Sequence, residues 1–376
     1  MIKKTLLSII KYPLTFVFAT FVFISFAAYG IGETAEFSPM ENRYLADKPH
    51  LSISGVKDAT YMTEFESYVK DQLPLRDVYI RGKAFLEELM LKDENNGIAR
   101  GKDGYLFEKN VGTSGNLSKN IAAIDTFVKN TDRDIYVAIA PTSVEILADK
   151  LPYGLHVLDE HMAMETLSQK VSGYNNVHLI DFTDALIKAA DESQVYYKTD
   201  HHWTTDGAYV AYNELSKIMG LKDIDLSLYN RHDVSDFYGT YYAKYKGNKV
   251  IGDTLSYYDI PVKSYIFDGK QLEGIYDESK LSEYDKYAMF MYGNPGEGTI
   301  ESGVCDNGRT LIILKDSYAN CLIPFLMCSY EKIISLDLRY YGGLVKEIID
   351  DNEADILLLY NWSFVNEDNH FYKMVK

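Results

Sequence analysis

An acidic residue, two histidines and a tryptophan stand side by side in residues 199–209, "TDHHWTTDGAY". The chain has only 8 histidines and 2 tryptophans, so this cluster is a candidate site. If the backbone is extended here, side chains two positions apart project to the same side, so Asp200 and His202 face together and His201 turns away. A carboxylate beside an imidazole fixes its tautomer and stabilises the imidazolium. The segment therefore predicts the base and its orienting acid in a nucleophilic triad.

Two other interpretations of this segment compete with a triad. Asp200 or Thr204 would cap a helix that begins near Thr205, because both side chains accept hydrogen bonds from backbone N–H groups. A metal site would use Asp200, His201 and His202 with a further histidine from the set His156, His161 and His178. Adjacent histidines in an extended strand diverge, and no H-x-x-x-H or H-E-x-x-H pattern occurs, so we expect no metal.

The nucleophile that such a base needs is predicted in residues 309–321, "RTLIILKDSYANC". A buried strand ends at Lys315, and Ser317 falls at the turn before a helix. This position exposes the hydroxyl at the carboxyl edge of a sheet, where ligands of open α/β folds bind. The N–H groups at the helix start could stabilise an oxyanion. The alternative is that Asp316 and Ser317 only cap that helix.

Composition limits the classes of function. The chain has 376 residues, a net charge of −17 and a pI of about 4.9. Such a field repels phosphate backbones, so we expect no nucleic-acid partner, and it favours neutral or cationic ligands. The three cysteines, Cys305, Cys321 and Cys328, are too few and too clustered for a disulfide framework, and we expect Cys321 and Cys328 to be core residues on one helix.

The N-terminus predicts the location. Lys3, Lys4 and Lys11 precede residues 12–32, which contain no charged side chain. About 20 apolar residues span a bilayer, and the positive residues are expected inside. We therefore expect a cytoplasmic tip and single-pass membrane anchor (1–32), a tether (33–60) and an extracytoplasmic domain (61–376). A cleaved signal peptide is the competing interpretation, since "SFAAYG" offers small residues near a plausible cut.

The rest of the chain alternates between helical and strand patterns. Residues 61–91 predict two helices separated at Pro74, and residues 97–110 predict a hairpin. From residue 118 onward, helices alternate with short apolar strands, and a helix after the histidines closes at Gly220. This order predicts an α/β fold with a doubly wound, mostly parallel sheet.

Residues 231–308 interrupt that alternation. They hold eleven tyrosines between Tyr238 and Tyr292 and show no clean periodicity. Tyrosine side chains stack on sugar rings, so the segment is either a binding lid or an insertion packed on the sheet edge.

These motifs together resemble a known family. "DHHW" at 200–203 and "KDSYAN" at 315–320 are similar to the DHHW family of bacterial membrane-anchored proteins, which themselves resemble SGNH-like alginate O-acetylation proteins. Four further segments carry the resemblance: "FESYVKDQLPLRD" (65–77), "GKDGYLF" (101–107), "APTSVEILADKLP" (140–152) and "DFYGT" (236–240). The resemblance extends over nearly everything after residue 32.

The resemblance implies an SGNH-like site with Ser317 as nucleophile, His202 as base and Asp200 as its orienting acid. In SGNH enzymes the serine usually follows Gly-Asp, whereas here it follows Lys315-Asp316, and the lysine could crowd the pocket or hold an anionic group. The glycine and asparagine that SGNH enzymes use for the oxyanion are assigned to Gly293 and Asn294. Two further candidates for substrate binding are Trp203 and Lys315, while Asn320 is expected on a helix surface.

The activity implied is O-acetylation of a cell-envelope or extracellular polysaccharide through an acetyl-enzyme, without a cofactor. A multi-span membrane-bound acyltransferase is the expected partner, and it would export the acetyl groups. Water as acceptor would make the protein a carbohydrate esterase. A third possibility is a non-catalytic protein that binds envelope glycans on a degenerate hydrolase fold.

Overall fold

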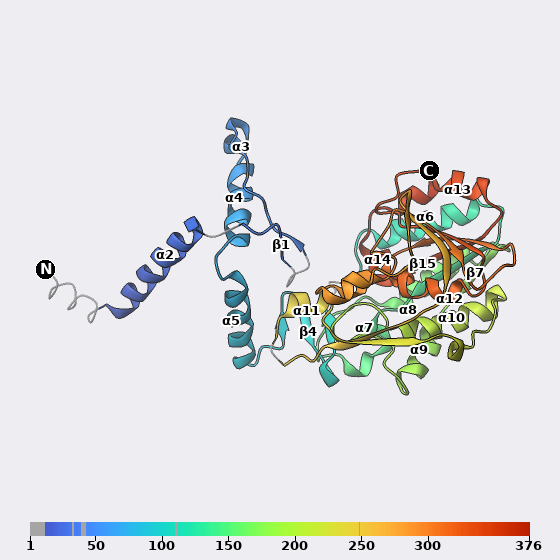
Figure 1. Ribbon diagram of the computed structural model, residues 1–376, viewed down its shortest axis with the longest axis horizontal. Coiled ribbons are helices and arrows are strands. Elements are labelled where there is room, and N and C mark those ends of the chain that lie inside the picture. Colours follow the sequence, from blue (N-terminus) through green and yellow to red (C-terminus); the bar gives the residue numbers. More distant parts are fainter. Residues whose placement is uncertain (1–11, 32–33, 39–42, 110–111, 248) are drawn as a thin grey trace. The chain divides into compact units, whose positions relative to one another are not determined.

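The computed structural model describes residues 12–31, 34–38, 43–109, 112–247 and 249–376 (Figure 1). The chain divides into two compact units: Met1–Leu91 with Lys246–Asn248, and Lys92–Tyr245 with Lys249–Lys376. The sequence groups residues 61–91 with the α/β domain, whereas the structure groups them with the first unit. The candidate site lies wholly in the second unit.

Helices dominate the first unit. The break predicted at Pro74 is confirmed, because one helix ends at Asp71 and the next begins at Arg76, with Leu75 in the left-handed region at φ 59°. The elements are α2 (Pro13–Ile31), β1 (Phe37–Ser38), β2 (Arg43–Tyr44), α3 (Ile53–Lys57), α4 (Thr60–Asp71) and α5 (Arg76–Leu89).

The sequence predicts a membrane-spanning helix over residues 12–32, and the structure has helix α2 there. Its 19 residues rise roughly 28 Å at 1.5 Å per residue, slightly less than the roughly 30 Å of a hydrocarbon core. Among the residues that the structure describes, no helix combines the length and the apolar character needed to cross a membrane. The predicted membrane-spanning helix is therefore not found, while residues 1–11 and 32 of the predicted anchor lie outside the described residues.

An eight-stranded sheet forms the centre of the second unit, in the order β11-β10-β12-β14-β13-β15-β6-β7. The five strands from β14 to β7 pair in parallel, whereas β12, β10 and β11 pair antiparallel. The strands are β6 (Ile135–Ala140), β7 (Val177–Ile180), β10 (Val262–Phe267), β11 (Lys270–Leu272), β12 (Glu297–Ser302), β13 (Thr310–Lys315), β14 (Lys332–Leu336) and β15 (Asp355–Asn361).

The α/β class is confirmed, but the sheet is mixed rather than mostly parallel. The reason is that residues 231–308 supply all three antiparallel strands, which extend the sheet beyond β14. Strands β14, β13, β15 and β6 are largely buried on both faces, as strands covered by helices on both sides must be, whereas the edge strand β7 is only partly buried.

Helices cover both faces of the sheet, and α6 and α13 lie on the opposite side of β7 and β15 from α10 and α12 (Figure 1). The first face packs α6 (Leu117–Lys129), α8 (Glu160–Val171), α13 (Val345–Asp351) and α14 (Trp362–Glu367). The second packs α7 (Ser143–Ile146), α9 (Thr183–Ala190), α10 (Thr205–Met219) and α12 (Ile323–Leu326). Gly220 ends α10 at φ 60°, as predicted. Cys321 and Cys328 are buried in this second layer, which confirms them as core residues.

Two small antiparallel sheets complete the second unit. The predicted hairpin is confirmed in the sheet of β3 (Glu94–Asn95), β4 (Ile98–Arg100) and β5 (Leu106–Glu108). The second sheet pairs β8 (Arg231–Phe237) with β9 (Asp253–Tyr258), and α11 (Thr240–Tyr245) lies between them in sequence. The remaining short helices of this unit are η1 (Lys102–Gly104), η2 (Ala148–Lys150), η3 (Leu226–Leu228), η4 (Glu278–Ser282), η5 (Lys286–Met289), η6 (Ser317–Cys321) and η7 (Phe371–Val375).

Candidate active site

The histidine segment forms a tight loop immediately before α10. Tyr196 and Trp203 form an antiparallel bridge across it, and the Tyr197 N–H donates to the carbonyl of His202 at 3.2 Å. Thr204 caps α10 by accepting a hydrogen bond from the N–H of Gly207 at 3.1 Å. Because Thr204 is the cap, the carboxylate of Asp200 is left for another contact.

Asp200, His202 and Ser317 form a continuous chain of contacts. The Nδ1 atom of His202 lies 2.5 Å from Oδ1 of Asp200, and its Nε2 atom lies 2.7 Å from Oγ of Ser317. The serine is 115 positions from the histidine in sequence. Asp200 is 1% exposed and His202 4% exposed, so water hardly competes for these bonds. This is the arrangement of an orienting acid, a base and a nucleophile.

The second carboxylate oxygen of Asp200 is held by the segment 236–240. Thr240 donates to it from its backbone N–H at 2.7 Å and from its hydroxyl at 3.0 Å. Burial opposes ionisation of this carboxyl, but the charges of His201 and His202 and these hydrogen bonds outweigh it and lower the pKa of Asp200. Asp200 is therefore a carboxylate at physiological pH, as an orienting acid must be.

His201 does not turn away from the pair, contrary to the expectation from an extended backbone. The loop is curved, so the His201 and His202 rings lie 3.7 Å apart. Nδ1 of His201 lies 2.7 Å from the Thr240 hydroxyl. One ligand atom each of Asp200, His201 and His202 lie within 4.8 Å of one another, close enough for a metal ion. Both ring nitrogens of His202 already contact Asp200 and Ser317, so an ion would have to replace these bonds.

Ser317 begins η6 at the end of β13, but it is not the cap of that turn. Asp316 accepts a hydrogen bond from the N–H of Tyr318 at 2.8 Å, and its other oxygen accepts from the N–H and side-chain amide of Asn361. Burial raises the pKa of Asp316 to about 6, against those hydrogen bonds. The hydroxyl of Ser317 is therefore free to contact His202. The continuous helix expected here is instead a five-residue 3-10 turn followed by α12.

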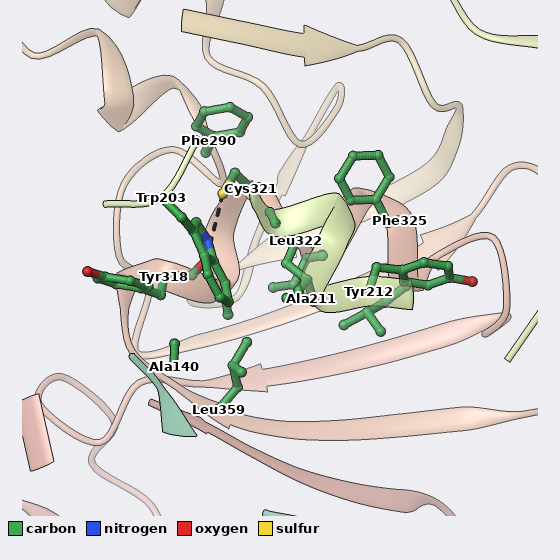
Figure 2. Close-up of a cluster of buried hydrophobic side chains, with 14 of the residues drawn as sticks. Ala140, Trp203, Ala211, Tyr212, Phe290, Tyr318, Cys321, Leu322, Phe325 and Leu359 are labelled. Atoms are coloured by element: carbon green, nitrogen blue, oxygen red, sulfur yellow. Dashed lines mark hydrogen bonds between the residues drawn. The ribbon is translucent and has the colours of Figure 1, made fainter. Parts of the chain in front are cut away.

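Aromatic side chains fix the residues on either side of the contact. Trp203 is fully buried and donates its indole N–H to the carbonyl of Tyr318 at 2.9 Å. Figure 2 shows Trp203 beside Tyr318, Cys321 and Leu322 within the apolar cluster. This packing ties the histidine loop to the serine turn.

Tyr287, from the tyrosine-rich insertion, covers the imidazole of His202. Its ring stacks on His202 with centroids 3.7 Å apart and planes 9° apart. Its hydroxyl donates to the carbonyl of Ser317 at 3.0 Å. The insertion therefore supports both the base and the serine turn, a role that its composition alone did not reveal.

A pocket of about 380 Å³, called here the serine pocket, opens beside Ser317. Its lining includes residues just after the carboxyl ends of the parallel strands β6, β13, β14 and β15, namely Thr142, Ser317, Arg339 and Ser363. Such edges are where ligands of α/β sheets bind. The pocket is lined by Glu108, Thr142, His201, Tyr241, Ser317, Tyr318, Arg339, Asn361, Ser363, Phe364, Glu367 and Asp368.

Arg339 is a pocket residue that the sequence analysis missed. Its Nε and Nη2 atoms bind the two carboxylate oxygens of the buried Asp337 at 2.9 and 2.6 Å. Its guanidinium carbon lies 5.2 Å from the ring centre of Tyr340 and 5.1 Å from that of Phe364. The guanidinium is thereby fixed in the lining of the pocket that also contains Ser317. The sequence signal that could have found it is its position, because Arg339 comes three residues after the end of β14 and therefore lies at the carboxyl edge of the parallel strands.

The other candidates from sequence are not brought into the serine pocket. Lys315 is fully buried and donates to Oδ1 of Asn320 at 2.6 Å, and burial lowers its pKa to about 8. Asn320 is also buried, not on a helix surface, and donates to the Gly293 carbonyl at 3.0 Å and the Asn294 side chain at 3.2 Å. Like Trp203, these residues support the serine turn from behind the pocket.

Three solved structures are similar to this chain. A DHHW family protein from Eubacterium siraeum is 26% identical, with a TM-score of 0.62 over 74% of this chain and 94% of that one. Bacillus cereus PatB1, solved with a sulfonyl adduct, is 22% identical, with a TM-score of 0.61 over 74% of this chain and 98% of that one. The O-acetyltransferase domain of Pseudomonas putida AlgJ is 15% identical, with a TM-score of 0.46 over 73% and 93%.

Among curated proteins no match was found. Residues 103–336 match the sequence profile of a family described as DHHW protein. The matched span includes the histidine loop, the tyrosine-rich insertion and the serine turn. On that match, the chain belongs to the DHHW protein family.

Proposed function

We propose that the protein is an SGNH-like O-acetyltransferase that acetylates hydroxyl groups of a cell-envelope or extracellular polysaccharide through an acetyl-serine intermediate. The observation that carries the proposal is the contact chain from Asp200 through His202 to Ser317, at 2.5 and 2.7 Å. It ends in a pocket at the carboxyl edge of the sheet.

In the first half-reaction, Nε2 of His202 takes the proton of Ser317 as Oγ attacks the carbonyl carbon of an acetyl ester. A tetrahedral oxyanion forms and collapses, and the bond to the donor's alkoxide oxygen breaks. His202 gives its proton to that leaving oxygen, so an acetyl-serine and a free alcohol result. Asp200 holds Nδ1 of the ring and stabilises the imidazolium between these steps.

In the second half-reaction, His202 takes a proton from a sugar hydroxyl, whose oxygen attacks the acetyl-serine. The second tetrahedral oxyanion collapses to the acetylated sugar, and His202 returns the proton to Ser317. The enzyme is then unchanged and the acetyl group has moved from one oxygen to another. If water replaces the sugar, the same cycle yields acetate, which is the esterase alternative.

Arg339 and the backbone N–H of Ser317 are the groups we assign to the oxyanion. The first N–H groups of a helical turn have no intrahelical partner. The Asp337 carboxylate binds Nε and Nη2 of Arg339, which leaves Nη1 to point elsewhere. A cation that is held rigid before the reaction stabilises developing negative charge without reorganisation.

We place this activity at the outer side of the cell envelope, where polysaccharide acceptors lie, with a multi-span acyltransferase as the source of acetyl groups. Three lysines precede the uncharged stretch 12–32, which supports an association of that segment with the membrane. Separation of cell membranes from the soluble fraction, followed by detection of the protein, tests this location. Recovery in the soluble fraction at both low and high salt would oppose it.

The test of the reaction uses the purified full-length chain and 4-nitrophenyl acetate, with and without an oligosaccharide acceptor. We expect nitrophenol release that Ser317→Ala abolishes and that Ser172→Ala, an exposed serine at the end of α8, does not change. A sulfonyl fluoride should add one sulfonyl group to Ser317, with loss of fluoride, as seen by mass spectrometry. Equal turnover by the wild type and Ser317→Ala would refute the triad.

A non-catalytic glycan-binding protein is the remaining alternative. It predicts that oligosaccharide binding occurs without any Ser317-dependent ester turnover. Acetylated sugar products, detected by mass spectrometry, separate a transferase from an esterase.

A further inference from the structure

A second hollow lies next to the serine pocket, and the loop that follows β14 lines both. Arg339 lines the serine pocket, and its neighbour Tyr340 lines the second hollow. This second space has a volume of about 460 Å³ and is called here the Tyr340 hollow. Its walls include Ile266, Asp268, Glu297, Thr299, Tyr340 and Gly342.

Tyr340 has an exposed side chain on a backbone that is held in place. The side chain is 60% exposed, while its backbone N–H donates to the carbonyl of Asp337 at 3.0 Å. Gly296 packs so closely on this loop that a Cβ atom there would lie 2.9 Å from the Tyr340 carbonyl carbon. The Arg339 guanidinium lies 5.2 Å from the ring centre. An exposed aromatic ring that is already positioned offers a flat apolar face at low entropic cost, which suits the apolar face of a sugar ring.

The polar groups of the hollow accept hydrogen bonds and carry negative charge. Asp268 is anchored by the N–H of Glu297 at 2.8 Å, and Glu297 and Thr299 project from β12. Among the described residues that line the hollow there is no lysine or arginine. Carboxylates bind sugar hydroxyls well but repel carboxylate, sulfate or phosphate substituents.

The serine pocket has the same bias. Glu108, Glu367 and Asp368 line it, and its one arginine is already paired with a buried aspartate. Burial and the charge of Glu108 raise the pKa of Glu367, against the charge of Lys244. Lys244 is paired with Glu108, so Glu367 and Asp368 carry the unneutralised negative charge of this pocket. An anionic polysaccharide would meet negative charge in both spaces.

We propose that the Tyr340 hollow is a saccharide subsite for an acceptor polysaccharide without anionic substituents, whose chain passes over the loop 337–342 into the serine pocket. This inference rests on the proposed function, since it assigns the acceptor of that same site. One sugar ring packs on Tyr340, the carboxylates accept its hydroxyl protons in hydrogen bonds, and the next ring presents a hydroxyl to the acetyl-serine.

Two matched pairs of variants test the subsite in the full-length chain. Tyr340→Ala removes the ring, and Tyr340→Phe keeps it. Gly342→Trp fills the hollow, and Gly342→Ala is its control, because a Cβ atom at Gly342 meets nothing within 4 Å and its φ lies outside the left-handed region. The probes are 4-nitrophenyl acetate as donor, a neutral β-1,4-linked glucose hexamer and a galacturonate hexamer as acceptors.

We expect the KM for the neutral hexamer to rise at least tenfold in Tyr340→Ala and Gly342→Trp. This rise is counted after correction for any change that each variant causes in ester hydrolysis without acceptor. Tyr340→Phe and Gly342→Ala should stay within about twofold of the wild type. The galacturonate hexamer should be the poorer acceptor for the wild type by at least tenfold. Unchanged KM values in Tyr340→Ala and Gly342→Trp, or preference for galacturonate, would overturn the inference.

Failure of the proposed function gives a different result. If no ester turnover depends on Ser317, direct calorimetric titration of Ser317→Ala with the neutral hexamer still reports on the subsite. Binding that is lost on adding Tyr340→Ala supports the subsite without the reaction. Absence of binding to both proteins overturns the subsite.

Discussion

Gly239 offers the sharpest test of how the site is held together. A Cβ atom at this position would lie 2.2 Å from Cβ and 2.3 Å from Oδ2 of Asp200. Carbon atoms in contact are about 3.5–4.0 Å apart, so Gly239→Ala must displace Asp200 by more than about 1 Å. The φ of Gly239 lies outside the left-handed region, so alanine is not otherwise strained there. The three heavy atoms nearest to the added Cβ all belong to Asp200, so the substitution acts first on this side chain.

The size of the effect follows from the role of the carboxylate. A 1 Å misplacement in a catalytic arrangement costs on the order of 100-fold in rate, and loss of the orienting acid of a triad costs about 10⁴-fold. We expect Gly239→Ala to lower kcat for an acetyl ester by about 10²–10⁴-fold. Neither Gly239 nor Asp200 lines the serine pocket, so KM should change little.

The assay is steady-state hydrolysis of 4-nitrophenyl acetate by the full-length chain, with thermal unfolding as a check on folding. Gly173→Ala is the matched control, because a Cβ atom there meets nothing within 4 Å and its φ is ordinary. The single variant Asp200→Ala and the double variant Asp200→Ala/Gly239→Ala should have nearly equal kcat, because the two substitutions disturb the same carboxylate. A folded Gly239→Ala protein with wild-type kcat would refute the reasoning.

Substitutions at three further positions give distinct outcomes. Burial raises the pKa of Glu160 to about 8, so the free energy of unfolding of the wild type should fall as pH rises from about 4.5 to 8. Glu160→Gln can still bond Thr142 and carries no charge. In urea unfolding it should be more stable than the wild type by a few kcal/mol at pH 8 but not at pH 4. Arg339→Gln should lower kcat about 10²-fold, and Arg339→Lys should restore little because lysine lacks the fork that Asp337 binds. Tyr287→Phe keeps the ring on the imidazole and should cost less than tenfold in kcat/KM, whereas Tyr287→Leu should cost more.

The sequence predicted much of the architecture because its strong signals are local. Apolar runs such as "TLIILK" and "DILLLY" are short, β-rich and separated by helical patterns, and they form the parallel strands. Ser317 follows the carboxyl end of β13, as its sequence predicts. The histidine loop lies between α9 and α10 and does not follow a strand of the sheet, so its contact with Ser317 depends on tertiary packing. The reaction that this contact would perform stays a prediction.

The parts that sequence reasoning missed all depend on contacts between distant segments. Residues 231–308 lack periodicity, so nothing local shows that β10–β12 join the main sheet or that Tyr287 stacks on the imidazole. Lys315 looked like a pocket residue because it precedes the serine by two positions. Its orientation depends on Asn320 and the loop at Gly293, which no local pattern specifies.

Both site motifs contain two residues able to cap a helix, and the structure resolves each competition in the same way. Thr204 caps α10, which leaves Asp200 for the histidine, and Asp316 caps η6, which leaves the Ser317 hydroxyl for the same ring. A helix start requires one capping acceptor, so the second polar residue in each motif is not needed as a cap. Asp200 instead accepts the backbone N–H groups of His202 at 2.9 Å and Thr240 at 2.7 Å, in addition to its contact with the His202 ring. Capping therefore does not explain why Asp200 and Ser317 are present, and their mutual contact with His202 does. The same argument separates a functional residue from a structural one wherever a motif offers more capping groups than its helix can use.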